Sequence, residues 1–306
     1  AIVGTATVSR WVVVGLVPLV ILIVIALIVR SVRRTWLPVR ELIRAAGSLA
    51  DGDYAARVEP NGSAAIRPVA RSFNDMARRL ERADEERRQL LADLGHELRT
   101  PLTVVQGEIE AMLDGVHEPD PDHLKLLLEE VAVMERLLED LRTLSLAEAG
   151  ALALHPEPID LPDLIDDVLE GQRRTASAAG VATSADIGPG IGEVVLDPVR
   201  IREVLTNLVI NALRAMPDGG ALTVGAQSDG ADLHLTVTDT GVGIAPQDLD
   251  QVFDRFRKGS TSKGSGLGLT ISRDLVEAHG GSIVIESAIG VGTTVAMSLP
   301  LVTTPL

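Results

Sequence analysis

The sequence contains no cysteine, and aromatic residues make up only 2% of its 306 residues. Without cysteine, neither a disulfide framework nor a thiolate metal site can form, which fits a reducing compartment. Because aromatic residues are so few, any core must be built from Leu, Val, Ile and Ala. Basic residues are outnumbered by acidic ones, and the formal net charge is −15. Since phosphate contacts need clustered Lys and Arg, nucleic-acid binding is disfavoured.

One long segment near the N-terminus, Trp11 to Val29, carries no charged residue. It approaches the roughly 20 apolar residues that cross a bilayer, and a membrane helix tolerates its internal Pro18. A cleaved signal peptide is the alternative, but the segment exceeds a usual signal core and no small-residue cleavage site follows. We therefore predict a transmembrane helix over residues 11–30.

Arginines follow this apolar segment, at positions 30, 33, 34, 40 and 44. By the positive-inside tendency they place this end of the span in the cytoplasm, so that residues 1–10 lie outside. Residues 1–10 are too few for a sensor domain, and we expect them to be the remnant of a longer extracytoplasmic part. The length of the chain predicts two or more domains.

Residues 37–86 contain two amphipathic segments separated by a break. The first ends at Asp51-Gly52-Asp53, and the second starts near Ile66 with apolar residues every three to four positions. Two short helices cannot bury such stripes alone, so the pattern predicts pairing in a parallel dimer. A plain charged linker is the alternative.

Residues 82–147 predict an antiparallel helical hairpin with a turn from Gly115 to Pro121. Each predicted helix carries an apolar seam with near-heptad spacing: Leu91, Leu94, Leu98, Val105, Ile109 and Met112, then Leu124, Leu128, Val131, Met134, Leu138 and Leu141. One hairpin presents more apolar surface than it can cover. A homodimeric four-helix bundle is therefore favoured.

Beyond residue 150 the pattern changes to interleaved helices and strands. Pro156 and Pro158 are interpreted as a linker. The predicted helices cover residues 160–180, 197–216 and 266–279, and the predicted hairpins pair 221–227 with 233–239 and 282–286 with 293–299. This interleaving predicts an α+β arrangement, with helices layered on a mixed β-sheet.

One of six histidines, His96, has an unusual context, because it lies beside the apolar seam of a predicted helix. Neutral imidazole is a good phosphoryl acceptor, since one nitrogen attacks while the other keeps its proton. Glu97 could hold that second nitrogen, and Thr100 lies one turn further on the same face. Pro101 predicts a kink in the helix. The remaining histidines have ordinary interpretations: His117, His123, His155, His234 and His279.

A second polar constellation is predicted on one face of the helix that starts at Asp197. Its members are spaced i, i+4, i+8 and i+11: Glu203, Asn207, Asn211 and Arg214. Side-chain oxygens of this kind suit Mg²⁺, which takes few protein ligands and keeps much of its water. A purely structural helix would rarely align these polar groups beside so apolar a body.

Two glycine-rich blocks follow this helix. Asp239 ends a predicted strand, and Gly241 and Gly243 allow a ligand to approach the backbone closely. The second block opens the helix that ends at His279, where backbone amides favour anions: Gly264, Gly266, Leu267 and Gly268. Between the blocks lie Phe253, Phe256 and a predicted mobile lid.

Taken in this order, the motifs resemble those of sensor histidine kinases of two-component systems. Asp93 to Leu102, with the sequence DLGHELRTPL, looks like the H box of the HisKA type. Residues 203–214 look like the N box, 239–244 like the G1 box and 264–269 like the G2 box. Residues 37–86 resemble a HAMP domain, but they lack the acidic residue that often starts its second helix.

The resemblance implies roles for individual residues. His96 would be phosphorylated, Glu97 would assist as an acid or base, and Thr100 would support phosphatase activity. Asn207 would hold Mg²⁺, and Glu203 would help to activate the metal or a water.

Further implied roles concern the nucleotide. Asn211 and Arg214 would contact its phosphates, Asp239 would read the adenine amino group, and the glycine blocks with Leu267 would line the site. Lys258 stands where relatives often place an arginine, and Arg255 or Arg257 could substitute for it.

The resemblance also implies an organisation: an extracytoplasmic remnant (1–10), a transmembrane helix (11–30), a HAMP linker (31–86), a dimerisation and phosphotransfer domain (87–150) and a catalytic domain of the Bergerat fold (151–306). It implies ATP and Mg²⁺ as ligands, a response regulator as partner, and a homodimer in a bacterial plasma membrane with its catalytic region in the cytoplasm. A GHKL-type ATPase and a catalytically silent relay scaffold are the alternatives. The stimulus, the cognate regulator, transfer within or across the dimer, and kinase or phosphatase dominance stay open.

Overall fold

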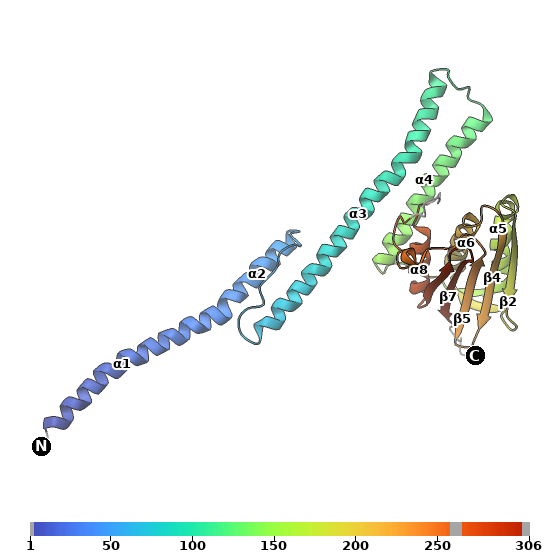
Figure 1. Cartoon of the computed structure of the whole chain (residues 1–306). Coiled ribbons are helices and arrows are strands. Elements are labelled where there is room, and N and C mark those ends of the chain that lie inside the picture. The colour runs from blue at the N-terminus through green and yellow to red at the C-terminus, as the bar shows by residue number, and fades with distance from the viewer. Residues whose placement is uncertain (1–2, 258–264, 302–306) are drawn as a thin grey trace. The chain divides into compact units, whose positions relative to one another are not determined.

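The computed structural model describes residues 3–257 and 265–301 (Figure 1). The chain divides into two compact units, residues 1–92 and residues 93–306. One helix, α3 (Ile66–Leu113), contributes residues to both units. It is continuous where the sequence was interpreted as two helices, because no glycine or proline interrupts residues 81–93.

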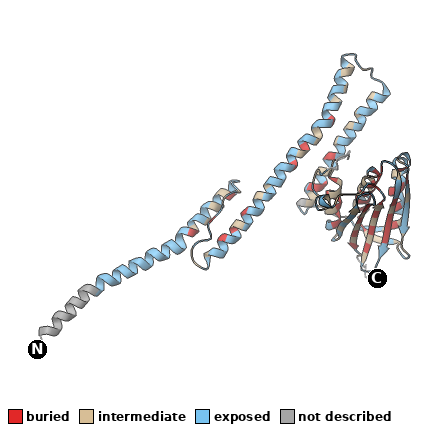
Figure 2. Cartoon of the chain, viewed as in Figure 1, coloured by how far each residue is buried: buried red, intermediate tan, exposed pale blue. Residues whose placement is uncertain are grey.

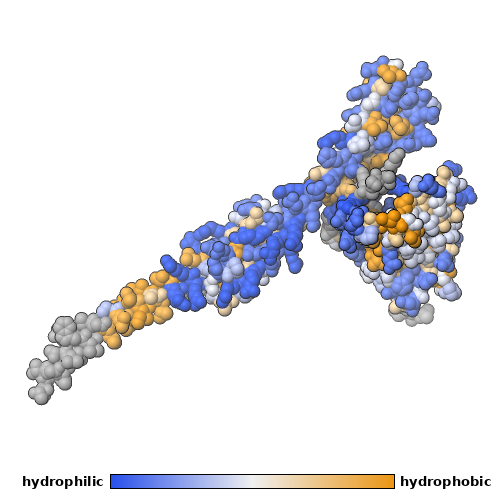
Figure 3. All heavy atoms as spheres, in the orientation of Figure 1, coloured by the Kyte–Doolittle hydropathy of each residue, from blue (hydrophilic) through white to orange (hydrophobic). Residues whose placement is uncertain are grey.

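The first unit begins with α1 (Val3–Ser31), which a short π-helical segment (Val32–Trp36) joins to α2 (Leu37–Ala50). From residue 16 to residue 32 every described side chain of this helix is exposed. Figure 3 shows a band of hydrophobic surface there. By length and composition, this is the one helix among the described residues that could cross a membrane.

The two helices predicted in residues 37–86 pack against each other through a small core. Its buried members are Leu49, Val58, Ala70, Phe73 and Ala77. The first helix ends at Ala50, and Gly52 takes a positive φ of 91° in the predicted break.

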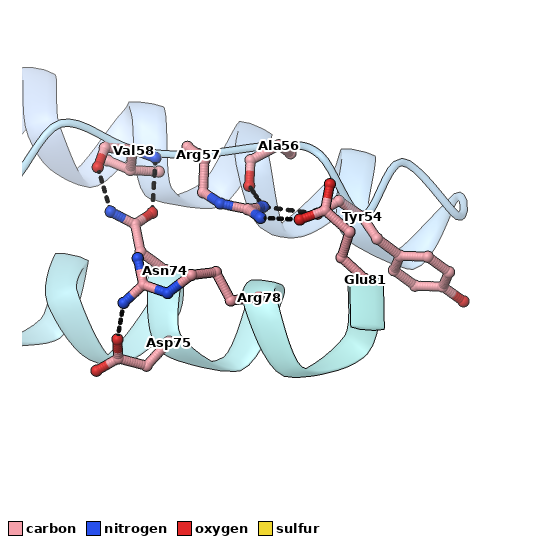
Figure 4. A network of polar contacts seen from close by, with 8 residues as sticks. All are labelled: Tyr54, Ala56, Arg57, Val58, Asn74, Asp75, Arg78 and Glu81. Carbon is pink, nitrogen blue, oxygen red and sulfur yellow. Dashed lines mark hydrogen bonds and ion pairs between the residues drawn. The ribbon is translucent and has the colours of Figure 1, made fainter. Parts of the chain in front are cut away.

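Polar contacts fasten the connecting segment to the start of α3 (Figure 4). The amide of Asn74 accepts from the backbone N–H of Val58 at 2.9 Å and donates to its carbonyl at 2.8 Å. Arg57 pairs with Glu81 of the same helix. Because the Val58 backbone is satisfied by a side chain, the connector lies against α3 without forming a strand.

In the second unit, the part of α3 from residue 93 onward forms a hairpin with α4 (Pro121–Glu148). Asp120 is the N-cap of α4, and its side chain accepts from the backbone N–H groups of Asp122 and His123. This satisfies donors that have no partner within the helix. The turn between the helices lies where Gly115 to Pro121 predict it.

The rest of the second unit is an α+β lobe, as predicted. Its five-stranded sheet has the order β2 (Val181–Ile187), β4 (Gly220–Ser228), β5 (Asp232–Asp239), β7 (Gly292–Pro300), β6 (Ser282–Ala288). A separate pair is formed by β1 (Glu157–Asp160) and β3 (Glu193–Leu196), and the helices are α5 (Leu161–Ala178), α6 (Pro198–Arg214), α7 (Pro246–Leu249) and α8 (Gly268–Ala278). Strands β2 and β4 are parallel and the other pairs antiparallel, so the sheet is mixed.

Three short strands and the start of one helix in the lobe differ from the sequence interpretation. Strands β1, β2 and β3 were not predicted, and Pro158, interpreted as part of a linker, lies in β1 opposite Val195. Helix α8 begins at Gly268 instead of Gly266, because Gly266 has a φ of +73°, which a right-handed helix does not allow.

One face of the sheet carries the core of the lobe. Along β5 the residues Leu233, Leu235 and Val237 are buried and alternate with half-buried polar residues. Buried residues of α5, α6 and α8 belong to the same core (Figure 2). The lobe therefore has two layers, helices over a sheet, with α6 and α8 in contact above it.

Candidate functional site

Helix α6 carries the predicted polar constellation on one face. Its body is anchored by buried Ile201, Leu205 and Leu208. Glu203, Asn207 and Asn211 are half-buried and Arg214 is exposed at the last turn. The helix thus fixes four polar side chains at the margin of the core, where a ligand can reach them.

Contacts join this face to the second glycine block. A Cβ atom added at Gly268 would lie 3.6 Å from the Asn207 side-chain carbon Cγ, so the two residues are in contact. Gly268 is the first residue of α8, whose first amides have no intrahelical partner. Glu203 pairs with Arg200 at 2.9 Å. The structure therefore places the polar face of α6 beside the N-terminus of α8, where backbone amides favour anions.

Asp239 lies at the end of β5 and is only 7% exposed. Its Oδ1 accepts from the backbone N–H groups of Gly241 at 2.8 Å and Thr293 at 3.2 Å. Burial raises the pKa of Asp239, although these two hydrogen bonds act in the opposite direction. A buried carboxylate held in place in this way has a fixed acceptor to offer to a ligand donor.

The glycines around Asp239 leave no room for side chains. A Cβ at Gly241 would lie 2.5 Å from the carbonyl oxygen of Ala215, and one at Gly243 would lie 2.1 Å from that of Ala288. Gly292 was not predicted as part of the site, yet its Cβ would lie 2.0 Å from the carbonyl oxygen of Asp239. The signal that could have revealed it is the Gly290-x-Gly292 spacing at a hairpin.

The predicted phenylalanines lie between the glycine blocks. Thr270 of α8 donates to the carbonyl of Phe253 at 2.8 Å, and the guanidinium of Arg273 lies 5.7 Å from the Phe253 ring centre. Phe256 has a positive φ of 55°, and Gly266 packs directly against its backbone. These contacts fasten the segment before the lid to α8.

Part of the predicted site lies outside the described residues. This applies to Lys258, Gly264 and the predicted lid at 260–262. Of the neighbouring cations, Arg257 forms an ion pair with Asp248 at 3.0 Å.

His96 is exposed on α3. The Thr100 hydroxyl lies 3.5 Å from the carbonyl oxygen of His96, to which it donates. Glu97 is half-buried beside it, and α3 continues through Pro101. The kink that Pro101 predicts stays a prediction.

One contact between α4 and the second glycine block was not predicted. Ser265 donates to Asp140 of α4 at 3.2 Å. Burial raises the pKa of Asp140 to about 6, with the charge of Glu203 as a further cause. On either side of it, Leu137 and Leu144 are buried in the same core as the lobe. A second apolar stripe on α4, from Leu137 to Leu144, could have indicated in the sequence that α4 packs against the lobe.

Comparison with known families gives three matches along the chain. Residues 30–82 match the HAMP domain, and residues 86–150 match the His Kinase A (phospho-acceptor) domain. Residues 196–303 match the histidine kinase-, DNA gyrase B- and HSP90-like ATPase family.

Individual proteins agree with these matches. The signal transduction histidine-protein kinase BaeS of Escherichia coli (strain K12) is 33% identical over 298 residues, which are 96% of this chain and 63% of BaeS. The chain therefore spans somewhat less than two thirds of that relative. Among solved structures, the Acinetobacter baumannii histidine kinase AdeS is 31% identical with a TM-score of 0.60, covering 68% of this chain and 98% of AdeS. Full-length ShkA in complex with AMPPNP is 27% identical with a TM-score of 0.54, covering 71% of this chain and 47% of ShkA.

Proposed function

Because this chain belongs to the sensor histidine kinases, we propose that it transfers the γ-phosphoryl group of ATP to its own His96 and then to an aspartate of a response regulator. The observation that carries the proposal is the pairing of an exposed histidine on a helical hairpin with a lobe that combines Asn207, Asp239 and a glycine-lined helix start.

The nucleotide would bind between α6, the end of β5 and the start of α8. Asp239 would accept from the exocyclic amine of adenine, and the side-chain-free backbone of Gly241 and Gly243 would let the base approach. The phosphates would lie by Asn211, Arg214 and the first amides of α8. ShkA, which this chain resembles, was solved with the ATP analogue AMPPNP.

The residues present fit a magnesium ion. Asn207 and Glu203 offer oxygen ligands on one helix face, and hard oxygen ligands are what Mg²⁺ prefers. When bound, the ion would neutralise charge on the phosphates. Its two protein groups need no rearrangement of α6, because they lie one turn apart on a helix fixed by its buried face.

In the proposed reaction a neutral His96 nitrogen attacks the γ-phosphorus in line, an N–P bond forms and the bond to the ADP oxygen breaks. Catalysis consists mainly of positioning and charge stabilisation. Glu97 would hold the proton on the other imidazole nitrogen, which keeps the attacking nitrogen unprotonated. Thr100, one turn further on, would position the water that later hydrolyses the phosphorylated regulator.

We further propose that the chain acts as a homodimer anchored in a membrane. Large apolar side chains of the hairpin are exposed in a single chain, among them Leu113 at 82% and Leu128 at 69%. A second copy would cover them in a four-helix bundle. Helix α1 would cross the membrane, and the arginines after it would keep the catalytic region in the cytoplasm.

The decisive experiment is incubation of the full chain in detergent with γ-labelled ATP and Mg²⁺. We expect acid-labile label on the protein, no label on His96→Gln, and unchanged ATP binding by that variant in calorimetry. His155→Gln is the matched control and should label normally. Undiminished labelling of His96→Gln would refute the assignment of the acceptor.

Two other outcomes would indicate the alternatives. Hydrolysis of ATP without any phosphoprotein would identify a simple ATPase, and a flat titration with ATP and Mg²⁺ would identify a silent scaffold. Adding candidate response regulators to the labelled protein then tests the second transfer.

A further inference from the structure

Three side chains with metal-ligating groups meet at the turn between α3 and α4, away from the nucleotide site. They are Glu108 near the end of α3, His117 in the turn and His123 in the first turn of α4, and all three are half-buried. One ligand atom from each lies within 4.8 Å of the other two. The motifs of the kinase give these residues no role.

The cluster is already partly ordered by its own contacts. His117 Nδ1 lies 2.9 Å from Glu108 Oε2, and the two imidazole rings are 4.7 Å apart with a tilt of 31°. His123 Nδ1 lies 2.9 Å from Asp120 Oδ1. If His123 donates through Nδ1 to this carboxylate, the lone pair of Nε2 is available for a metal. Carboxylates orient metal-binding histidines in the same way.

The surrounding charge favours a cation. Between Arg99 and Lys125 the sequence has no Lys or Arg. The same segment contains several carboxylates: Glu108, Glu110, Asp114, Glu118, Asp120 and Asp122. No fixed positive charge from this segment therefore opposes a divalent ion at the turn.

We propose that Glu108, His117 and His123 form a zinc site that ties the two helices of the hairpin together at their turn. Two imidazole nitrogens with one carboxylate are typical zinc ligands, whereas Mg²⁺ and Ca²⁺ take oxygen ligands. Two ligands on tetrahedral zinc lie roughly 3.3 Å apart, close to the 2.9 Å between His117 and Glu108. Water completes the fourth position.

The test is calorimetric titration of the chelator-treated full chain in detergent with Zn²⁺, without ATP. We expect one zinc ion per chain and an affinity more than about tenfold weaker in the double variant His117→Ala, His123→Ala. The matched control is His155→Ala, His234→Ala, which removes two histidines elsewhere and should bind zinc as the parent does. Equal binding by the parent and by the His117, His123 variant would overturn the proposal, as would no binding by the parent.

A second variant separates ligation from folding. Glu108→Gln removes only the ligand charge, and we expect it to weaken zinc binding while the circular dichroism of the helices stays unchanged. Zinc should also raise the thermal unfolding temperature of the parent and not that of the double variant, since a ligand that binds only the folded state stabilises it. X-ray absorption of the zinc-loaded parent should show imidazole ligands, and a shell of water and carboxylate oxygens alone would contradict the site.

Discussion

The α+β lobe and the helical hairpin differ in how far their leucine side chains are buried within one chain. In the lobe, Leu233, Leu235 and Leu205 are fully buried within one chain. In the hairpin, Leu113 and Leu128 are 82% and 69% exposed. Large exposed apolar side chains often mark an interaction surface. The lobe therefore buries its leucine core within one chain, whereas the hairpin leaves leucine surface that a partner could cover.

The largest loss of stability is expected when a buried side chain of the lobe is shortened. Leu235→Ala should lower the free energy of unfolding of the lobe by about 2–5 kcal/mol, because it leaves a cavity under the sheet. Hydrogen exchange of the sheet amides measures this directly. Val284→Ala, at a position 57% exposed on the same sheet, should change it by no more than about 0.5 kcal/mol. Similar losses in both variants would contradict a core in this place.

Shortening an exposed leucine of the hairpin should instead weaken association of two chains. Leu128→Ala should weaken the dimer by about 1.5–3 kcal/mol per chain, because a partner would bury this side chain. Sedimentation equilibrium gives the dissociation constant. Val199→Ala, at a lobe position that is 67% exposed, is the control and should leave the dimer intact. A dimer indifferent to Leu128 would place the interface elsewhere.

Nucleotide binding should depend on the lobe alone. Asp239→Asn can keep the hydrogen bonds from Gly241 and Thr293 but presents an amide where adenine needs an acceptor, so ATP affinity should fall about ten- to a hundredfold. Calorimetry with ATP and Mg²⁺ tests this. Asp232→Asn, at the other end of the same strand, should bind ATP normally, and an equal loss there would argue for general damage to the sheet.

The weakest expected effect concerns the contact at which α4 meets the lobe. Burial raises the pKa of Asp140 from its ordinary value of 3.8 to about 6. Folding therefore favours the protonated form of Asp140. The stability that this protonation contributes is fully present below about pH 3.8 and is lost as the pH rises through about 6. The fold around Asp140 should lose on the order of 1 kcal/mol of stability between pH 5 and pH 7, because the ionised carboxylate is poorly solvated there; the figure allows for solvent screening at a half-buried group.

Hydrogen exchange around Ser265 at the two pH values measures this loss. Asp140→Asn should flatten the pH dependence, while Glu139→Gln, at an exposed neighbour, should not. An unchanged profile in Asp140→Asn would show that another group titrates.

Local signals in the sequence predicted much of the fold. The Asp229-Gly230 turn and the alternation around it predict the β4–β5 hairpin, and Gly290 predicts the β6–β7 hairpin. Strand β2 has no such signal, because its parallel partner β4 lies beyond an intervening helix and its own residues are largely exposed. Strands β1 and β3 are four residues each, too short for a period to show.

The residues of the candidate site also fall into those that short motifs predict and those that only the fold brings together. His96, Asn207 and Asp239 lie in short motifs whose spacing is visible in the sequence. Asp140 and Ser265 are 125 residues apart, and only the fold brings them within hydrogen-bonding distance. The cluster at the turn could be predicted only in part. His117 and His123 are close in sequence, but the structure is needed to show that Glu108 of α3 lies beside them.

The crowding at Gly241, Gly243 and Gly292 has a consequence for genetics. Alanine at any of them would collide with a backbone carbonyl oxygen, at 2.0 to 2.5 Å from the new Cβ. Such alleles would reduce the amount of folded protein, and a mutational scan would score them together with core defects. A strain built to lack only ATP turnover is better made by exchanging Asn207, whose side chain can change without forcing the main chain to move.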